Sequence, residues 1–279
     1  MPMRGNYYRK KIVLSETGET KRILRGLKLH SVCEESRCPN ISECFKKKTT
    51  TFLILGDTCT RNCLFCSVKK GKPATLDEEE PCRVAEAVKM LGMGYVVVTS
   101  VTRDDLRDGG AEMFRRTVEE IRNAGFTGKI EVLIPDFNGD ERFIEKVVRS
   151  SPDVISHNME TVARLYPVLR SKSCYSRSLN VLKKIKELNP RQKIKSGIML
   201  GLGETEDEVF ATIEDIASTN CEFLSIGQYL APLKVSYPVQ RYFSDEEFGY
   251  FKERAYSYGF KHIESGVYVR TSYNAALYL

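Results

Sequence analysis

The chain has 279 residues, 42% of them hydrophobic and 29% charged, so it can bury a core large enough for one α/β barrel or for two domains. Its formal net charge of +6 is modest and mixed with acidic residues, which argues against a nucleic-acid-binding surface and leaves an acidic protein partner compatible. The first eleven residues are polar and basic, without an apolar stretch of signal-peptide or membrane-spanning length. We therefore expect a cytoplasmic, reducing location with no membrane partner.

Residues 1–30 combine many charges with little hydrophobic periodicity, which predicts an extended arm with one short helix near Thr20–Leu27. A cysteine triplet follows, with Cys33, Cys38 and Cys44 in the spacing Cx4Cx5C. In a reducing compartment such a group is expected to bind metal. An iron–sulfur cluster, a zinc knuckle and three free thiols are the interpretations it allows on its own.

A second triplet, Cys59, Cys63 and Cys66, lies just after the apolar run Thr51–Leu55 in the spacing Cx3Cx2C. A four-iron cluster held by three thiolates keeps one iron without a protein ligand, and that iron can take a substrate or a second cofactor. A structural zinc site needs a complete tetrahedral set, and no paired cysteine or histidine group stands beside this loop. The sequence therefore predicts a [4Fe-4S] cluster here and favours a second one on the upstream triplet.

From residue 51 onward, apolar runs of strand length alternate with amphipathic stretches of helix length. The expected strands are Thr51–Leu55, Tyr95–Thr99, Ile130–Ile134, Val154–Asn158, Ile194–Leu200 and Phe223–Tyr229. The expected helices are Glu78–Leu91, Ala111–Ala124, Glu141–Ser150, Arg177–Leu188, Glu206–Ser218 and Asp245–Tyr258. Six β/α units predict an α/β fold, a partial (β/α)6 TIM-like barrel, with a doubly wound open sheet as the alternative.

Polar segments follow several of these strands, where a barrel brings the carboxyl ends of its strands together. They are Cys59–Cys66, Ser100–Asp108, His157–Glu160 and Gly201–Glu204. Each is equally compatible with an ordinary loop, and for Thr205 with Glu208 we expect a capping box at the start of a helix. Their shared edge is what indicates a common site.

The end of the chain, Ser265–Tyr273, is rich in valine and tyrosine. Chain ends are often disordered, but this composition predicts an extra strand or a return segment that docks on the barrel.

The Cys59–Cys66 loop, with Phe65 before its last cysteine, resembles the cluster loop of radical S-adenosylmethionine (SAM) enzymes. From Leu29 onward the chain is more specifically similar to the lipoyl synthase family. The similarity rests on the two cysteine triplets in this order and on the stretches Thr51–Thr60, Thr99–Ala111, His157–Arg170, Ser196–Thr205, Gly227–Leu230 and Arg270–Tyr273.

The resemblance implies a sulfurtransferase. Members of the family take an octanoyl chain, amide-linked to a lysine of a lipoyl carrier domain, and replace one hydrogen at C6 and one at C8 with sulfur. Acid–base chemistry does not break such C–H bonds at neutral pH, so a cofactor-derived radical is required. In the family one [4Fe-4S] cluster cleaves SAM to a 5′-deoxyadenosyl radical, and a second, auxiliary cluster donates the sulfur and is consumed.

By this resemblance the Cx3Cx2C triplet holds the SAM-cleaving cluster, and Cys33, Cys38 and Cys44 hold the sulfur donor. The family's tail motif is Arg-Ser-Ser-Tyr, whose second serine ligates the fourth iron of the donor cluster; that position is Ser272 here. A hydroxyl oxygen is a hard, weak ligand for iron beside thiolates, so we expect the Ser272–iron bond to be labile. Arg270 is expected to act beside it at the catalytic site.

For SAM itself, the resemblance implies a pocket at the strand ends. Phe65 is expected against the adenine or the cluster. Asn158, Glu160 and Arg170 are expected to hold the ribose, amine and carboxylate, since an arginine fork can bind both carboxylate oxygens. Thr99 is expected to help shape this pocket or to cap the following segment.

Three positions depart from the family pattern. Thr271 replaces the first serine of the tail motif, Ser236 stands near an expected histidine, and Ser171 occupies a position where proline is usual. We expect small changes in tail packing and in a loop contact to SAM or substrate. The remaining cysteines are expected to be structural or adventitious thiols: Cys82, Cys174 and Cys221.

Three parts are expected: an N-terminal extension (1–50) carrying the auxiliary-cluster cysteines, a radical SAM barrel (51–258) and a C-terminal segment (259–279) closing over the auxiliary cluster. Expected partners are an octanoylated carrier, either a dehydrogenase E2 subunit or the glycine-cleavage H protein, a reductant such as flavodoxin or ferredoxin, and an iron–sulfur cluster carrier. No nucleic-acid partner is expected. The alternatives are another sulfur-inserting radical SAM enzyme and, less favoured, an iron–sulfur electron carrier.

Overall fold

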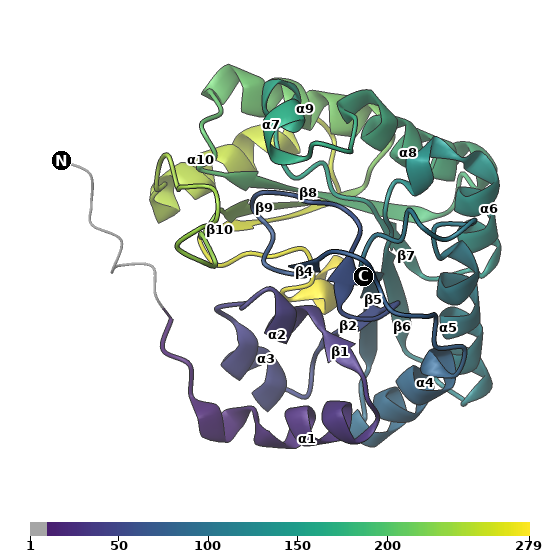
Figure 1. The fold of residues 1–279 in the computed structure, drawn as a ribbon. Coiled ribbons are helices and arrows are strands. Elements are labelled where there is room, and N and C mark those ends of the chain that lie inside the picture. The colour runs from purple at the N-terminus through teal and green to yellow at the C-terminus, as the bar shows by residue number, and fades with distance from the viewer. Residues whose placement is uncertain (1–9) are drawn as a thin grey trace.

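Eight strands form one curved sheet in the computed structural model, which describes residues 10–279 (Figure 1). Their order is β1 (His30–Ser31), β2 (Thr51–Ile54), β5 (Tyr95–Ser100), β6 (Lys129–Leu133), β7 (Val154–Ser156), β8 (Lys193–Leu200), β9 (Phe223–Gln228) and β10 (His262–Gly266). β1 is antiparallel to β2, and the other pairs are parallel. The strands follow sequence order without the reversal of a doubly wound sheet. The predicted partial TIM-like barrel is confirmed.

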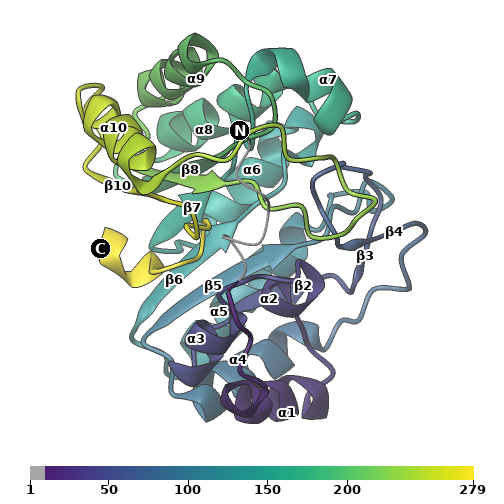
Figure 2. The same ribbon diagram turned by 90° about the vertical axis from the view of Figure 1, so that its left-hand side faces the viewer.

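Six long helices cover the outer face of the sheet, as Figures 1 and 2 show. They are α4 (Glu80–Leu91), α5 (Ala111–Asn123), α6 (Glu141–Arg149), α8 (Tyr175–Leu188), α9 (Glu206–Ser218) and α10 (Asp245–Tyr256). Every residue of β2 and of β9 is buried. Burial on both faces explains why these strands are continuous apolar runs in the sequence rather than alternating ones.

Helix caps fix where the loops at the barrel mouth end. Thr205 accepts from the backbone N–H of Glu208, whose side chain accepts from the backbone of Thr205, so the predicted capping box is present at the start of α9. Ser244 and Glu247 form the same arrangement at the start of α10. Each box satisfies backbone donors that the first helical turn leaves without a partner.

The expected elements differ from the observed ones mainly at their ends. β7 ends at Ser156 rather than at Asn158. Glu160, four residues after the end of β7, has a left-handed φ of +66°. The last strand is His262–Gly266, so the prediction of an extra strand over Ser265–Tyr273 placed the strand too late, whereas the alternative of a docked return segment is confirmed. Beyond β10 the chain leaves the sheet but stays docked, with Val267 and Val269 buried.

Short elements flank the barrel. Before β2 lie η1 (Leu14–Glu16), α1 (Gly18–Gly26), α2 (Val32–Glu35) and α3 (Ile41–Lys46), where the sequence predicted only the helix matching α1. The others are β3 (Thr58–Cys59), β4 (Lys69–Lys70), η2 (Phe137–Gly139), η3 (Ala163–Leu165), α7 (Tyr166–Leu169) and η4 (Ala275–Tyr278). Figures 1 and 2 show α2 and α3 beside the yellow C-terminal segment. Between residues 10 and 279, no helix combines the length and apolar character needed to cross a membrane.

Candidate active site

The Cx3Cx2C loop leaves the carboxyl end of β2 through two left-handed residues, Leu55 (φ +70°) and Gly56 (φ +87°). The backbone N–H of Leu55 donates to the buried carboxylate of Glu80 at 2.7 Å, and its carbonyl accepts from Arg103 at 3.2 Å. A left-handed leucine is strained and persists only where surrounding contacts hold it. These two side chains therefore define the direction in which the cysteine loop departs from the barrel.

Arg61, inside this loop, is only 5% exposed and braces it against the barrel. Its guanidinium donates to Asp104 at 2.8 and 2.9 Å, to Asp136 at 2.7 and 3.0 Å, and also to Asn138 and Ser173. Burial alone would raise the pKa of Asp136, but the Arg61 guanidinium outweighs it and holds that pKa at about 2. The loop is thus locked by a charged network at the mouth of the barrel.

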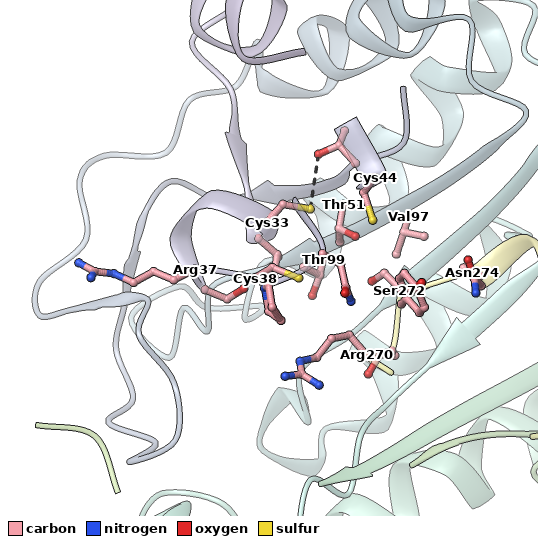
Figure 3. Close-up of a pocket in the computed structure, with 18 of the residues that line it drawn as sticks. Cys33, Arg37, Cys38, Cys44, Thr51, Val97, Thr99, Arg270, Ser272 and Asn274 are labelled. Carbon is pink, nitrogen blue, oxygen red and sulfur yellow. Dashed lines mark hydrogen bonds between the residues drawn. The ribbon is translucent and has the colours of Figure 1, made fainter. Parts of the chain in front are cut away.

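The upstream triplet is carried by α2, the turn after it, and α3. Cys33 lies in α2, which Ser31 caps by accepting from the N–H of Glu34. The Cys38 N–H donates to Cys33 O at 3.1 Å, and the Cys44 N–H to Asn40 O at 3.0 Å. Two short helices therefore hold three thiols on one side of a cavity (Figure 3).

The C-terminal segment faces this triplet. Asn40 donates to Tyr268 O at 2.7 Å, and the Tyr273 hydroxyl donates to Glu43 at 3.0 Å. The Lys10 ammonium lies 4.7 Å from the centre of the Tyr268 ring, within cation–π range. The N-terminal extension and the tail therefore meet directly at this side of the cavity.

Ser272 and Arg270 enter the same cavity from the tail, opposite Cys33 and Cys38 (Figure 3). Arg270 donates to its neighbour's carbonyl, Val269 O, at 2.6 Å, and burial lowers the pKa of its guanidinium although Cys38 opposes this. A β-carbon at Gly227 of β9 would overlap Val269 O, so the glycine lets the tail approach the strand.

One cavity of about 730 Å³ spans the region between the two cysteine triplets. The predicted residues that line it are Cys33, Cys38, Cys44, Phe65, Cys66, Thr99, Asn158, Glu160, Arg270 and Ser272. Cys59, Cys63 and Arg170 are not part of its lining. Apolar side chains from inside the barrel, Val97, Leu133 and Met199, also line it. The cavity therefore joins the upstream triplet and Cys66 of the Cx3Cx2C loop to an apolar space within the barrel.

Burial strongly disfavours the ionised thiols in both triplets. It raises the pKa of Cys33 to about 12 and those of Cys44 and Cys66 to about 11. Without positive charge nearby these groups stay protonated, and iron would supply the charge that makes them thiolates. The donor sets fit the predicted clusters, because each triplet gives three soft ligands on a short loop. Within residues 10–279, no three His, Cys, Asp or Glu side chains are arranged to bind a single metal ion.

A polar group stands at the end of β7. Asn158 Nδ2 donates to Glu160 Oε1 at 3.0 Å and to the hydroxyl of Thr271 in the tail at 2.8 Å. Burial raises the pKa of the Glu160 carboxyl, with Arg170 and Asn158 opposing. Arg170 Nη1 donates to Asn158 O at 3.2 Å and to the Tyr166 hydroxyl at 2.8 Å. The structure thus brings three of the predicted SAM residues together.

Two buried polar atoms of this group lack a hydrogen-bond partner within the described part of the chain, Asn158 Oδ1 and Arg170 Nε. Buried polar atoms are normally paired, so such orphans indicate a polar ligand. SAM, with its ribose, amine and carboxylate, fits this requirement. Thr99 differs, because its hydroxyl already donates to Leu133 O at 2.8 Å.

Several positions were not identifiable from the sequence. Arg61 and Thr271 meet their partners across long stretches of chain, and no local pattern marks them. Ser236 lies in a turn, and its backbone N–H donates to Leu233 O at 3.1 Å. All nine cysteines are free thiols, with Cys221 buried and the other two outside the triplets exposed: Cys82 and Cys174.

Curated proteins of similar sequence match nearly the full chain. The sequence profile of the Radical SAM superfamily matches residues 53–216. A lipoyl synthase of Caldicellulosiruptor saccharolyticus is 58% identical over 257 residues, which cover 92% of this chain and 90% of that protein. A lipoyl synthase of Geotalea daltonii is 52% identical over 275 residues, covering 99% and 93%.

Solved structures of similar fold are more distant in sequence. The FeFe-hydrogenase maturase HydG from Carboxydothermus hydrogenoformans has a TM-score of 0.62 at 16% identity, over 88% of this chain and 65% of that one. Methylornithine synthase has a TM-score of 0.58 at 15% identity, over 88% and 74%. At this level of identity the likeness concerns the fold alone.

Proposed function

This chain belongs to the lipoyl synthase family of the radical SAM superfamily, and from that premise we propose which of its residues carry out each part of the reaction. It is a sulfurtransferase that inserts two sulfur atoms, at C6 and C8, into a protein-bound octanoyl chain. It uses SAM and two [4Fe-4S] clusters. When bound, these cofactors supply the radical that removes hydrogen and the sulfide that replaces it.

Cys59, Cys63 and Cys66 would hold the SAM-cleaving cluster. The Arg61 network keeps the loop that carries these three thiols in place at the barrel mouth. Asn158, Glu160 and Arg170 would hold the polar groups of SAM, since two of their buried atoms still lack partners in the described residues. Phe65 would close the pocket as an apolar wall, with Thr99 shaping its base.

Cys33, Cys38 and Cys44 would hold the donor cluster, with Ser272 as its fourth ligand. Ser272 enters the cavity opposite the cysteines, on a tail that Asn40 and Glu43 tie to the N-terminal helices. Because a hydroxyl is a weaker ligand for iron than a thiolate, Ser272 would be the most weakly bound ligand of this set. Arg270 would offset negative charge beside Cys38.

A cavity lined by the whole upstream triplet and by Cys66 of the Cx3Cx2C loop is the observation that supports this assignment. Its apolar interior, with Val97, Leu133 and Met199, suits an octanoyl chain, which must meet both cofactors in one reaction. The substrate would be delivered by a lipoyl carrier domain such as a dehydrogenase E2 subunit or the glycine-cleavage H protein. A reductant and an iron–sulfur cluster carrier would serve the two clusters, in the cytoplasm. The division into 1–50, 51–258 and 259–279 follows these roles.

The test is sulfuration of an octanoyl-lysine peptide by the anaerobically reconstituted chain with SAM and dithionite. We expect singly and then doubly sulfurated peptide by mass spectrometry. Ser272→Ala should still cleave SAM but fail to transfer sulfur, and it should lose iron from the donor site. Thr271→Ser, at the neighbouring position, serves as the matched control. Unchanged iron content and turnover in Ser272→Ala would remove the ligand role from this residue.

A further inference from the structure

Three large apolar side chains are exposed around the Cx3Cx2C loop. Leu64, between Cys63 and Cys66, is 36% exposed, Val168 is 54% exposed and Val235 is 90% exposed. Burying such side chains is favourable by roughly 25 cal/mol for each Å² removed from water, and an apolar group gathered at a functional loop indicates a contact surface. Their position beside two predicted cluster ligands makes this surface part of the site.

Backbone hydrogen bonds tie the three segments together. The Leu64 N–H donates to Leu169 O at 3.0 Å, and the Leu64 carbonyl accepts from the Tyr237 N–H at 3.2 Å. Val168 precedes Leu169, and Val235 lies two residues before Tyr237. The exposed side chains therefore belong to adjoining segments rather than to separate parts of the surface.

Lysines surround this apolar centre. β4 pairs with β3 so that Lys70 lies opposite Cys59, and the N–H of Gly71 donates to Cys59 O at 3.0 Å. Lys172 donates from its ammonium to Thr60 O at 3.3 Å, within the cysteine loop. Two more exposed lysines adjoin these segments: Lys72 and Lys234. We call the surface formed by these four lysines and by Leu64, Val168 and Val235 the cluster-loop face.

The charge of the cluster-loop face is not neutralised by its own residues. Within the part of the chain that the structure describes, none of its four lysines forms an ion pair; the adjacent Lys69 has Asp57 at 3.6 Å. By contrast, each lysine of the Lys46–Lys48 run is paired with a glutamate. An apolar centre with an unpaired basic rim is typical of a surface that docks an acidic protein, because opposite charges steer the encounter.

We propose that the cluster-loop face docks an acidic protein that donates one electron to the SAM-cleaving cluster. The inference rests on the proposed role of Cys59, Cys63 and Cys66. In each transfer the donor's reduced cofactor loses one electron and the cluster gains it, with no bond made or broken. Leu64 is next in sequence to one ligand and two residues from another, so docking over it brings the donor close to the cluster.

The octanoylated carrier is the competing occupant. Residues just before this face, Leu230, Ala231 and Pro232, line the cavity, whereas Lys234 and Val235 do not. The part of the 231–239 segment next to the cysteine loop is therefore better placed to contact the electron donor. The part that lines the cavity is better placed to contact the carrier. The two occupants are separable by experiment.

The experiment reverses two charges of the cluster-loop face in the double variant Lys70→Glu/Lys72→Glu. Its control is the double variant Lys89→Glu/Lys183→Glu, whose two positions are exposed on α4 and α8. SAM cleavage is measured with reduced flavodoxin, an acidic one-electron donor, and separately with dithionite. We expect the KM for flavodoxin to rise about tenfold at low salt for the first pair only, and to become less dependent on salt. The dithionite rate and the iron content should not change.

Val235→Ser gives a second variant without a charge change, and we expect a smaller rise in the same KM. An unchanged KM for flavodoxin in the charge-reversed pair would overturn the proposal. So would an equal loss with dithionite, or a loss seen only when the octanoyl chain is presented on a carrier protein. Failure of sulfur insertion with dithionite would instead count against the proposed function, since SAM cleavage reports docking independently.

Discussion

Thr271, a departure from the family's tail motif, accepts a hydrogen bond from Asn158, which lies 113 residues earlier in the chain. Gly197 in β8 lies beside this pair, and a β-carbon there would overlap Ser225 Oγ at 2.5 Å and would lie 3.0 Å from Asn158 Oδ1 and 3.1 Å from Thr271 Oγ1. The residue before Ser272 is thereby joined to the residues proposed to hold SAM. The extra methyl group of the threonine does not prevent its hydroxyl from accepting this hydrogen bond.

Thr271→Val keeps the shape of the side chain and removes the acceptor for Asn158. A neutral hydrogen bond contributes about 1 kcal/mol, so we expect SAM to bind roughly fivefold more weakly. Equilibrium dialysis of SAM against the anaerobically reconstituted chain measures this. Thr271→Ser should bind within about twofold of the unmodified chain, and an unchanged affinity in Thr271→Val would contradict the prediction.

His157 is a buried histidine whose neutral form suits its site. Burial lowers its pKa to about 4, and its Nδ1 lies 2.9 Å from Ile134 O. The unfolded chain takes up a proton near pH 6.5, which the folded chain excludes until about pH 4. Between these values the unfolded state binds more protons, so stability falls as the pH is lowered, by at most about 1.4 kcal/mol per pH unit.

His157→Gln should therefore lose part of the pH dependence of unfolding. We expect the drop in the urea midpoint between about pH 7 and about pH 5.5 to be smaller in this variant, by about 1 kcal/mol when converted to free energy. Circular dichroism at matched iron content follows the transition. Identical drops in the unmodified chain and in His157→Gln would refute the role of His157.

At the scale of elements, the cysteine loop is held by contacts from three directions. Glu80 of α4 binds the turn at its start, Arg103 binds the same turn from the loop after β5, and Asp136 after β6 binds Arg61. None of these partners touches a cysteine. These contacts fix the course of the loop backbone. The spacing of the cysteines then fixes where their side chains lie along the loop.

Asp136→Asn tests this arrangement. Removing one charge from a buried pair leaves Arg61 undercompensated, which typically costs about 3–5 kcal/mol. We expect a lower urea midpoint and loss of iron from the Cx3Cx2C cluster during anaerobic gel filtration. Asp77→Asn, which breaks the exposed pair with Arg83, should cost less than about 1 kcal/mol. Full iron retention and an unchanged midpoint in Asp136→Asn would show that the network does not hold the loop.

At the scale of the whole molecule, the C-terminal segment is fastened inside the barrel. The Tyr278 ring lies 4.2 Å from the ammonium of Lys195, and its hydroxyl donates to Leu224 O at 3.3 Å. Lys195 is itself paired with Glu131 at 2.8 Å, both fully buried. The tail is thus held at this end by contacts with the barrel itself, and with the proposed roles these contacts would keep Ser272 in place while the donor cluster is consumed.

Tyr278→Ala should loosen the tail and weaken the hold of Ser272 on the donor cluster. We expect iron to pass to a ferrous chelator several-fold faster from that cluster, with the other cluster retained, leaving about four of about eight irons. Tyr278→Phe keeps the ring over Lys195 and should behave almost as the unmodified chain does. Equal rates for Tyr278→Ala and Tyr278→Phe would show that the ring does not anchor the tail.

The alternation of strands and helices, the capping box at Thr205 and the spacing of both cysteine triplets were readable from the sequence. Each of these features depends on residues that are close together in the chain, so local periodicity and the spacing of the cysteines are sufficient to predict it. The tail strand was placed too late, because valine and tyrosine pack equally well in a docked loop. The helices α2 and α3 were missed because each is shorter than two turns of a periodic pattern.

Only the tertiary structure decided which distant residues meet. Arg61 with Asp136, Asn158 with Thr271 and Lys195 with Glu131 are separated by 75, 113 and 64 residues. Such pairs form because the curved sheet brings segments that are far apart in the chain around one interior, and the charge or hydroxyl of each residue carries no mark of its partner. The sequence by itself determined the candidate ligands and the six central parallel strands; the path of the chain in space determined what holds them.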